Sequence, residues 1–144
     1  MKKIKSERGQ SLVELAISIV ILIYLLAGAV EFGIVFFQYV QLRDAAQEGA
    51  LYGSMHPPAN STADTSAIQT RAKNASDSPI KLSTDPNVTV DVVVTDAKYC
   101  EGGSLEVTVS YPHTVFMPFM SQFIGQTVNL EAVVTDTILT PICP

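Results

Sequence analysis

A long stretch without proline and almost without charge constrains the fold of this chain more than any other feature. Residues 10–42 carry only two charges, Glu14 and Glu31, and all eight prolines come after position 56. The sixteen uncharged residues Leu15–Val30 would form a helix of about 24 Å, slightly less than the ~30 Å hydrocarbon core of a bilayer. The apolar run resumes beyond Glu31, so a tilted or shifted helix could still cross. The stretch therefore predicts a membrane-spanning helix.

The distribution of charge indicates how this helix is oriented. Residues 1–9 hold four basic residues and one acidic residue, a balance of +3, whereas residues 10–144 hold five basic and thirteen acidic residues, a balance of −8. Positive charges remain on the cytoplasmic side of a membrane. We therefore expect a single-pass membrane protein with a cytoplasmic N-terminus and an extracytoplasmic body. The alternative is a cleaved secretory signal peptide, but the apolar stretch is long for one and Glu14 interrupts it.

Glu14 stands where a membrane helix is expected to be apolar. An acidic residue at the centre of such a helix costs about 2.5–3.5 kcal/mol, and less near the interface. One interpretation is that Glu14 reaches the headgroups or favours the dipole of the first helical turn. The other is that it pairs with a positive charge on another chain, because ionisable residues within membranes are candidate functional residues.

The residues around Glu14 are similar to a known processing site. Arg8–Glu14 (RGQSLVE) resembles the cleavage region of type IV pilin-like precursors, in which a short basic leader and a Gly precede an apolar helix with Glu at its fifth position. The resemblance implies that a prepilin peptidase cleaves between Gly9 and Gln10. It also implies that Glu14 aids assembly by neutralising the new N-terminal amine of a neighbouring subunit. Gln10 departs from the Phe that begins many mature pilins.

Further motifs narrow the resemblance to one family. The sequence contains Glu31–Gly33 (EFG), Ala45–Gly53 (AAQEGALYG) and Val107–Pro112 (VTVSYP), which resemble segments of the TadE-like proteins of the tight-adherence (Flp) pilus system. The family implies a structural or assembly subunit that sits in a pilus filament or at its base, as a minor pilin or pseudopilin. It implies other pilin subunits and a prepilin peptidase as partners, and a place in a cell-surface pilus that serves adhesion.

Glu31 lies 17 residues after Glu14, which corresponds to ~26 Å along a helix. It is therefore expected near the opposite membrane interface. It could be an interfacial charge, or it could be an assembly residue that a partner subunit recognises.

The pattern of the whole chain predicts an α+β, pilin-like fold, in which a long helix packs on a small antiparallel sheet. We expect a leader over residues 1–9, a long helix over 10–53 with its transmembrane or filament-core part over 10–42, a linker with a short helix over 54–86, and a sheet body over 87–144. In the long helix, a face of small side chains is expected to receive the sheet. Its members are Tyr39, Leu42, Ala46, Gly49 and Gly53. A short helix is expected over Thr62–Ala75, capped by Thr62, with Ile68 and Ala72 facing inward.

Three segments of the body alternate between apolar and polar residues, which is typical of half-buried strands. They cover Val88–Val94, Leu105–Tyr111 and Val128–Val134. Between the second and third, Thr114–Ile124 is the most apolar part of the body. It could be a loop that covers the core or a contact patch for another subunit or for the outer membrane leaflet. The candidate contact residues are Phe116, Phe119, Met120 and Phe123.

Both cysteines, Cys100 and Cys143, fall in the predicted extracytoplasmic body, where oxidising conditions favour a disulfide. The alternative is two free thiols.

The sequence shows no nucleotide-binding or catalytic motif, and two histidines are few for a metal cluster. The net charge of −5 argues against nucleic-acid binding. We thus expect no enzymatic activity, no cofactor and no metal. The alternative function is a single-pass, membrane-anchored extracytoplasmic binding module outside any filament.

Overall fold

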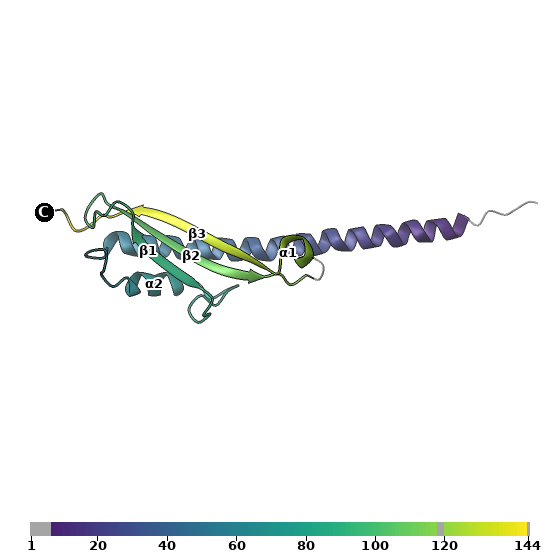
Figure 1. Cartoon of the computed structure of the whole chain (residues 1–144), viewed down its shortest axis with the longest axis horizontal. Coiled ribbons are helices and arrows are strands. Elements are labelled where there is room, and N and C mark those ends of the chain that lie inside the picture. The colour runs from purple at the N-terminus through teal and green to yellow at the C-terminus, as the bar shows by residue number, and fades with distance from the viewer. Residues whose placement is uncertain (1–6, 118–119, 144) are drawn as a thin grey trace, which may run out of the picture.

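The structure, a computed structural model, describes residues 7–117 and 120–143. Three helices and three strands follow one another along this part of the chain. They are α1 (Glu7–Met55), α2 (Ser66–Lys73), β1 (Thr89–Val94), β2 (Ser104–Thr114), α3 (Ser121–Ile124) and β3 (Thr127–Thr137). The three-stranded sheet lies along the C-terminal half of α1, while the N-terminal half of α1 projects beyond the body (Figure 1). The predicted α+β fold is confirmed.

The sheet is antiparallel, with strand order β1-β2-β3. Its core side is formed by the inward positions of the central strand, where Leu105, Val107 and Val109 are buried. Val107 lies opposite Val92 on one side and Val134 on the other. The alternation of apolar and polar residues thus predicted the three strands, although β2 and β3 each extend further than expected.

Small side chains on the C-terminal half of α1 allow the sheet to approach closely, as predicted. A Cβ at Gly49 would lie 3.0 Å from the Cβ of Ala72 and 3.3 Å from Val107, and one at Gly53 would lie 2.2 Å from Leu105. One position of the predicted face was wrong. Tyr39 is 42% exposed, whereas its neighbour Gln38 is buried, because at this level the helix turns a different side toward the body.

The short helix of the linker differs from its predicted bounds. It begins at Ser66, after Thr65, rather than with a cap at Thr62. The side-chain oxygen of Asn60 accepts hydrogen bonds from the N–H and the hydroxyl of Thr62, which closes a turn there. The inward-facing residues Ile68 and Ala72 are buried as predicted, so the apolar spacing was informative where the cap residue was not.

The body is closed at the end far from the projecting half of α1. Cys100 and Cys143 form the predicted disulfide, with their Cα atoms 5.2 Å apart. The N–H of Leu139 donates to the carbonyl of Ser54 at 2.8 Å, and that of Gly102 donates to the carbonyl of Ile138 at 2.9 Å. The first bond attaches the segment after β3 to the end of α1, and the second attaches it to the turn between β1 and β2.

Candidate functional site

The N-terminal half of α1 exposes large apolar side chains on all sides. Its most apolar window has a mean hydropathy of 2.5 and is only 6% buried. Ile17 is 58% exposed, Leu22 58% and Leu25 69%. Among the described residues α1 is the single helix long and apolar enough to cross a membrane. A surface of this kind needs either lipid or other helices around it.

Glu14 is an exposed carboxylate within this apolar surface. Its side chain has a neighbour one turn earlier, the amide of Gln10, whose Nε2 lies 3.4 Å from Glu14 Oε1. The hydroxyl of Ser18 donates to the backbone carbonyl of Glu14 and leaves the carboxylate uncovered. The bond between Gly9 and Gln10 lies at the start of the same helix. Most of the hydrogen-bonding capacity of Glu14 is therefore open to a group from outside the chain.

Glu31, in contrast, is buried and fully engaged within the chain. The residue is 2% exposed, and its Oε1 lies 2.8 Å from Nε2 of His113 on β2. The backbone N–H of Phe116 donates to Oε1 at 3.1 Å, and that of Met117 donates to Oε2 at 3.0 Å. A single side chain on α1 thereby holds the end of β2 and the segment that follows it.

This contact was not predicted from the sequence. Glu31 was expected to be either an interfacial charge or a group that another subunit recognises, and both roles require it to be accessible. The missed signal was His113, which continues the inward-facing positions Leu105, Val107 and Val109 of the second strand. A polar residue at an inward position needs a buried partner, and Glu31 is the charge closest to that end of the sheet along the predicted helix.

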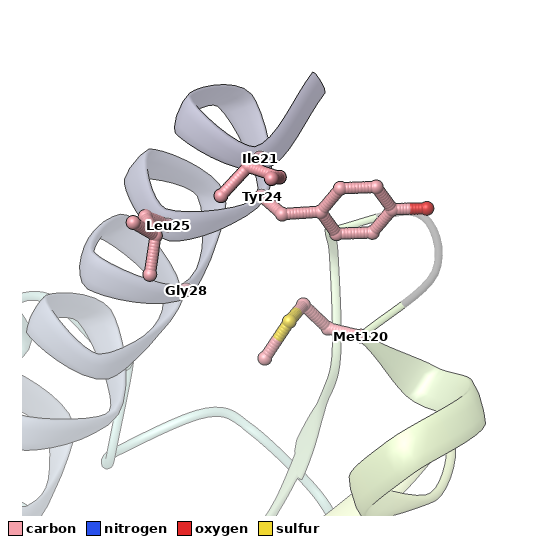
Figure 2. Close-up of a pocket in the computed structure, with 5 residues that line it drawn as sticks. All are labelled: Ile21, Tyr24, Leu25, Gly28 and Met120. Carbon is pink, nitrogen blue, oxygen red and sulfur yellow. The ribbon is translucent and has the colours of Figure 1, made fainter. Parts of the chain in front are cut away.

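The segment after β2 lies beside the projecting half of α1. The Cε of Met120 would be 3.8 Å from a Cβ at Gly28. Met120 and one side of α1 border an open, apolar groove of about 640 Å³ (Figure 2). The groove is lined by Ile21, Tyr24, Leu25, Gly28 and Met120.

The predicted contact residues are divided between two settings. Phe116 is 72% exposed, while Met120 faces α1. Phe119 lies outside the described residues, and the side chain of Phe123 is also outside them. The contact patch therefore stays a prediction that rests on Phe116 and Met120.

The comparison with protein families agrees with the motifs of the N-terminal region. Residues 9–51 match the family of TadE-like proteins. The matched segment contains Gln10, Glu14 and Glu31 and ends shortly before the end of α1. The resemblance seen in the sequence is confirmed for this segment, whereas Val107–Pro112 lies outside the match.

The TadE-like match covers the helix and not the sheet. No curated protein and no solved structure matches the chain. Within the described ranges, no group of three His, Cys, Asp or Glu side chains is placed to hold a metal ion. His56 stacks on Tyr52, with ring centroids 4.5 Å apart, and His113 is bonded to Glu31. Both histidines thus have structural contacts.

Proposed function

We propose that this chain is a structural subunit of a Tad/Flp-type pilus. α1 anchors it in the membrane, the sheet body is extracytoplasmic, and a prepilin peptidase cleaves between Gly9 and Gln10. The processed α1 then packs against other subunits in the filament or at its base. One observation carries this proposal: the N-terminal half of α1 is apolar all round and carries one accessible carboxylate, Glu14.

α1 can pass from the membrane into a filament because the helices of neighbouring subunits replace the lipid around it. Large side chains such as Leu22 and Leu25 can leave lipid for the helices of neighbouring subunits at little cost. Glu14 needs a counter-charge in either environment. Cleavage before Gln10 creates an amine, and the amine of a neighbouring subunit is a suitable partner for the Glu14 carboxylate.

Within a pilus, the chain could be either a minor or a major subunit. A minor pilin or pseudopilin would be present in few copies at the base or tip, whereas a major subunit would form the filament itself. The abundance of the chain in sheared filaments, measured by mass spectrometry, separates these versions. We favour the minor subunit because the resemblance of residues 9–51 to TadE-like proteins implies a minor pilin or pseudopilin.

The proposal is tested by replacing Glu14. We expect Glu14→Ala to reach the membrane at the wild-type level but to be reduced at least about tenfold in the sheared filament fraction, because a lost counter-charge of ~1.4 kcal/mol or more per contact changes an equilibrium by that factor. Asp44→Ala is the matched control, since Asp44 is an exposed carboxylate on the C-terminal half of α1. Incorporation of Glu14→Ala at the level of Asp44→Ala would contradict the proposal.

A further inference from the structure

The burial of Glu31 changes where the membrane can end along α1. If Glu31 were exposed, the uncharged span would stop at Val30. Because its carboxylate is enclosed by His113 and two N–H groups, the apolar outer surface of α1 continues past it. Phe32 is 71% exposed and Phe37 is 67% exposed. The next charged residue is Arg43.

This extension places part of the body at the depth of the hydrocarbon. A core of ~30 Å that begins at Leu15 requires about 20 helical residues and ends near Ile34. Gly28 and Glu31 would then lie ~9 Å and ~4–5 Å inside the outer boundary. Met120 contacts α1 at Gly28, and Glu31 holds the backbone of Phe116 and Met117.

Several backbone N–H groups in the described part of this segment are bonded within the protein. Non-helical backbone at membrane depth has to have its polar groups bonded within the protein. Besides the two N–H groups on Glu31, the N–H of Val115 donates to the carbonyl of Gln126 at 3.0 Å, that of Met120 to Met117 at 3.2 Å and that of Ile124 to Met120 at 3.1 Å.

The outer surface of the segment is uncharged and carries large apolar side chains beside exposed polar ones such as Gln122 and Gln126. Residues 114–130 contain no charged side chain, and two large apolar side chains point outward, Phe116 with 72% and Ile124 with 48% exposed. The groove between Met120 and α1 has apolar walls and is open to the outside (Figure 2). Its floor is the same helix that is exposed to lipid, so the groove is continuous with the lipid-facing surface.

We propose that Phe116, Met120 and Ile124 are seated in the outer leaflet of the membrane, and that a lipid acyl chain fills the groove between Met120 and α1. The inference rests on the membrane insertion in the proposed function. The body is then partly embedded in the bilayer rather than held above it, and it leaves the leaflet when the subunit is extracted. His113 and the N–H groups of Phe116 and Met117 shield the charge of Glu31, and these bonds also fix Phe116 and Met117 to the helix.

The chain contains no tryptophan, so a single introduced tryptophan reports its own surroundings. The full chain with Phe116→Trp is reconstituted at high lipid-to-protein ratio in phosphatidylethanolamine/phosphatidylglycerol vesicles that carry brominated acyl chains. Amphipathic elements seated at an interface reach about 5–10 Å into the headgroup and acyl region, so we expect this tryptophan to lose about half of its emission or more. Ile124→Trp carries the same expectation and replaces Phe116→Trp if the latter does not fold, as judged by circular dichroism.

Two further variants make the outcome specific. Leu139→Trp is exposed at the far end of the body beside Ser54, ~30 Å beyond Ile34 along α1, and is expected to be quenched by iodide in the water and not by brominated lipid. Leu22→Trp lies in the predicted span and is expected to be quenched by deep bromine. Loss of quenching in Leu22→Trp contradicts membrane insertion itself.

Two results would overturn the inference while leaving the proposed function intact. In the first, Leu22→Trp is quenched by lipid but Phe116→Trp responds to iodide as Leu139→Trp does. In the second, Phe116→Trp is shielded from iodide without being quenched by lipid, and the shielding disappears when the protein is diluted with lipid. The second result would assign the surface to another copy of the chain.

Discussion

The two halves of α1 use their apolar residues in opposite ways. In the N-terminal half the side chains are large, and most of their surface is exposed, as for Leu25 at 69%. In the C-terminal half many residues facing the body are small, and Ala45 and Ala46 are completely buried. Small residues let a sheet approach, whereas the large exposed residues of the N-terminal half cover a helix that has only lipid or other helices beside it.

The glutamates of α1 show the same contrast. Glu14 is exposed with one weak contact in its own chain, and Glu31 is enclosed by three donors from β2 and the following segment. A carboxylate in the first setting is available to a partner. A carboxylate in the second holds its own fold together. Three stability predictions test these two contrasts, beginning with the largest effect.

Replacement of Glu31 is expected to be the most damaging. Glu31→Ala leaves His113 and two backbone N–H groups buried without their acceptor, and breaking a buried pair in this way costs about 3–5 kcal/mol. The free energy of unfolding in detergent micelles, followed by circular dichroism, measures the cost. Hydrogen exchange at the amides of Phe116 and Met117 should accelerate as well.

Glu14→Ala is the matched control for that experiment, since it removes the same group from the same helix. Its effect on unfolding is expected to stay within about 0.5 kcal/mol, as for other exposed positions. Equal effects of the two substitutions would contradict the division between a carboxylate for partners and one for the fold.

Substitution of glycine tests the two faces of α1 by size. Gly53→Leu must displace Leu105, which is completely buried, and we expect a loss of about 3 kcal/mol through overpacking. At Gly33 an added Cβ meets nothing within 4 Å, so Gly33→Leu should leave stability unchanged or raise it by up to about 1 kcal/mol of helix propensity. Thermal unfolding of both variants in the same detergent makes the comparison, and a smaller loss for Gly53→Leu than for Gly33→Leu would refute close packing at Gly53.

Substitution of Asp96 tests whether burial, rather than hydrogen bonding alone, makes Glu31 important for stability. Asp96 is fully exposed, and its pKa lies below the usual value because the backbone N–H groups of Lys98 and Ser104 donate to it. A lowered folded pKa contributes stability above about pH 4, and the contribution is lost as the pH falls through the folded pKa. Asp96→Asn should therefore destabilise slightly at neutral pH and reduce the acid dependence of the melting temperature. A loss as large as that of Glu31→Ala would show that burial is unimportant.

Much of the fold could be predicted from patterns that are local in sequence. The charge-free run up to Val30 predicted the exposed helix, the alternation around Val107 predicted the central strand, and the location of both cysteines predicted their disulfide. Each of these signals lies within one element or follows from the compartment of the body. They needed no knowledge of which residues meet in space.

The junction between the helix and the body could not be predicted in the same way. Glu31 and His113 are separated by 82 residues, and each alone is consistent with several roles. Gln41 was missed for the same reason: its amide is bonded at 2.7 Å to both the N–H and the carbonyl of Ile80, which fixes the linker to α1. Polar residues that serve the fold become recognisable only when their partners are known.

The most direct test of the proposed function is the N-terminal sequence of the mature chain. The full chain is expressed with and without a prepilin peptidase, purified from membranes and analysed by mass spectrometry. We predict a chain that starts at Gln10 when the peptidase is present and at the original N-terminus when it is absent. An intact N-terminus in cells that assemble functional pili would contradict the pilin-like account and favour a membrane-anchored binding module.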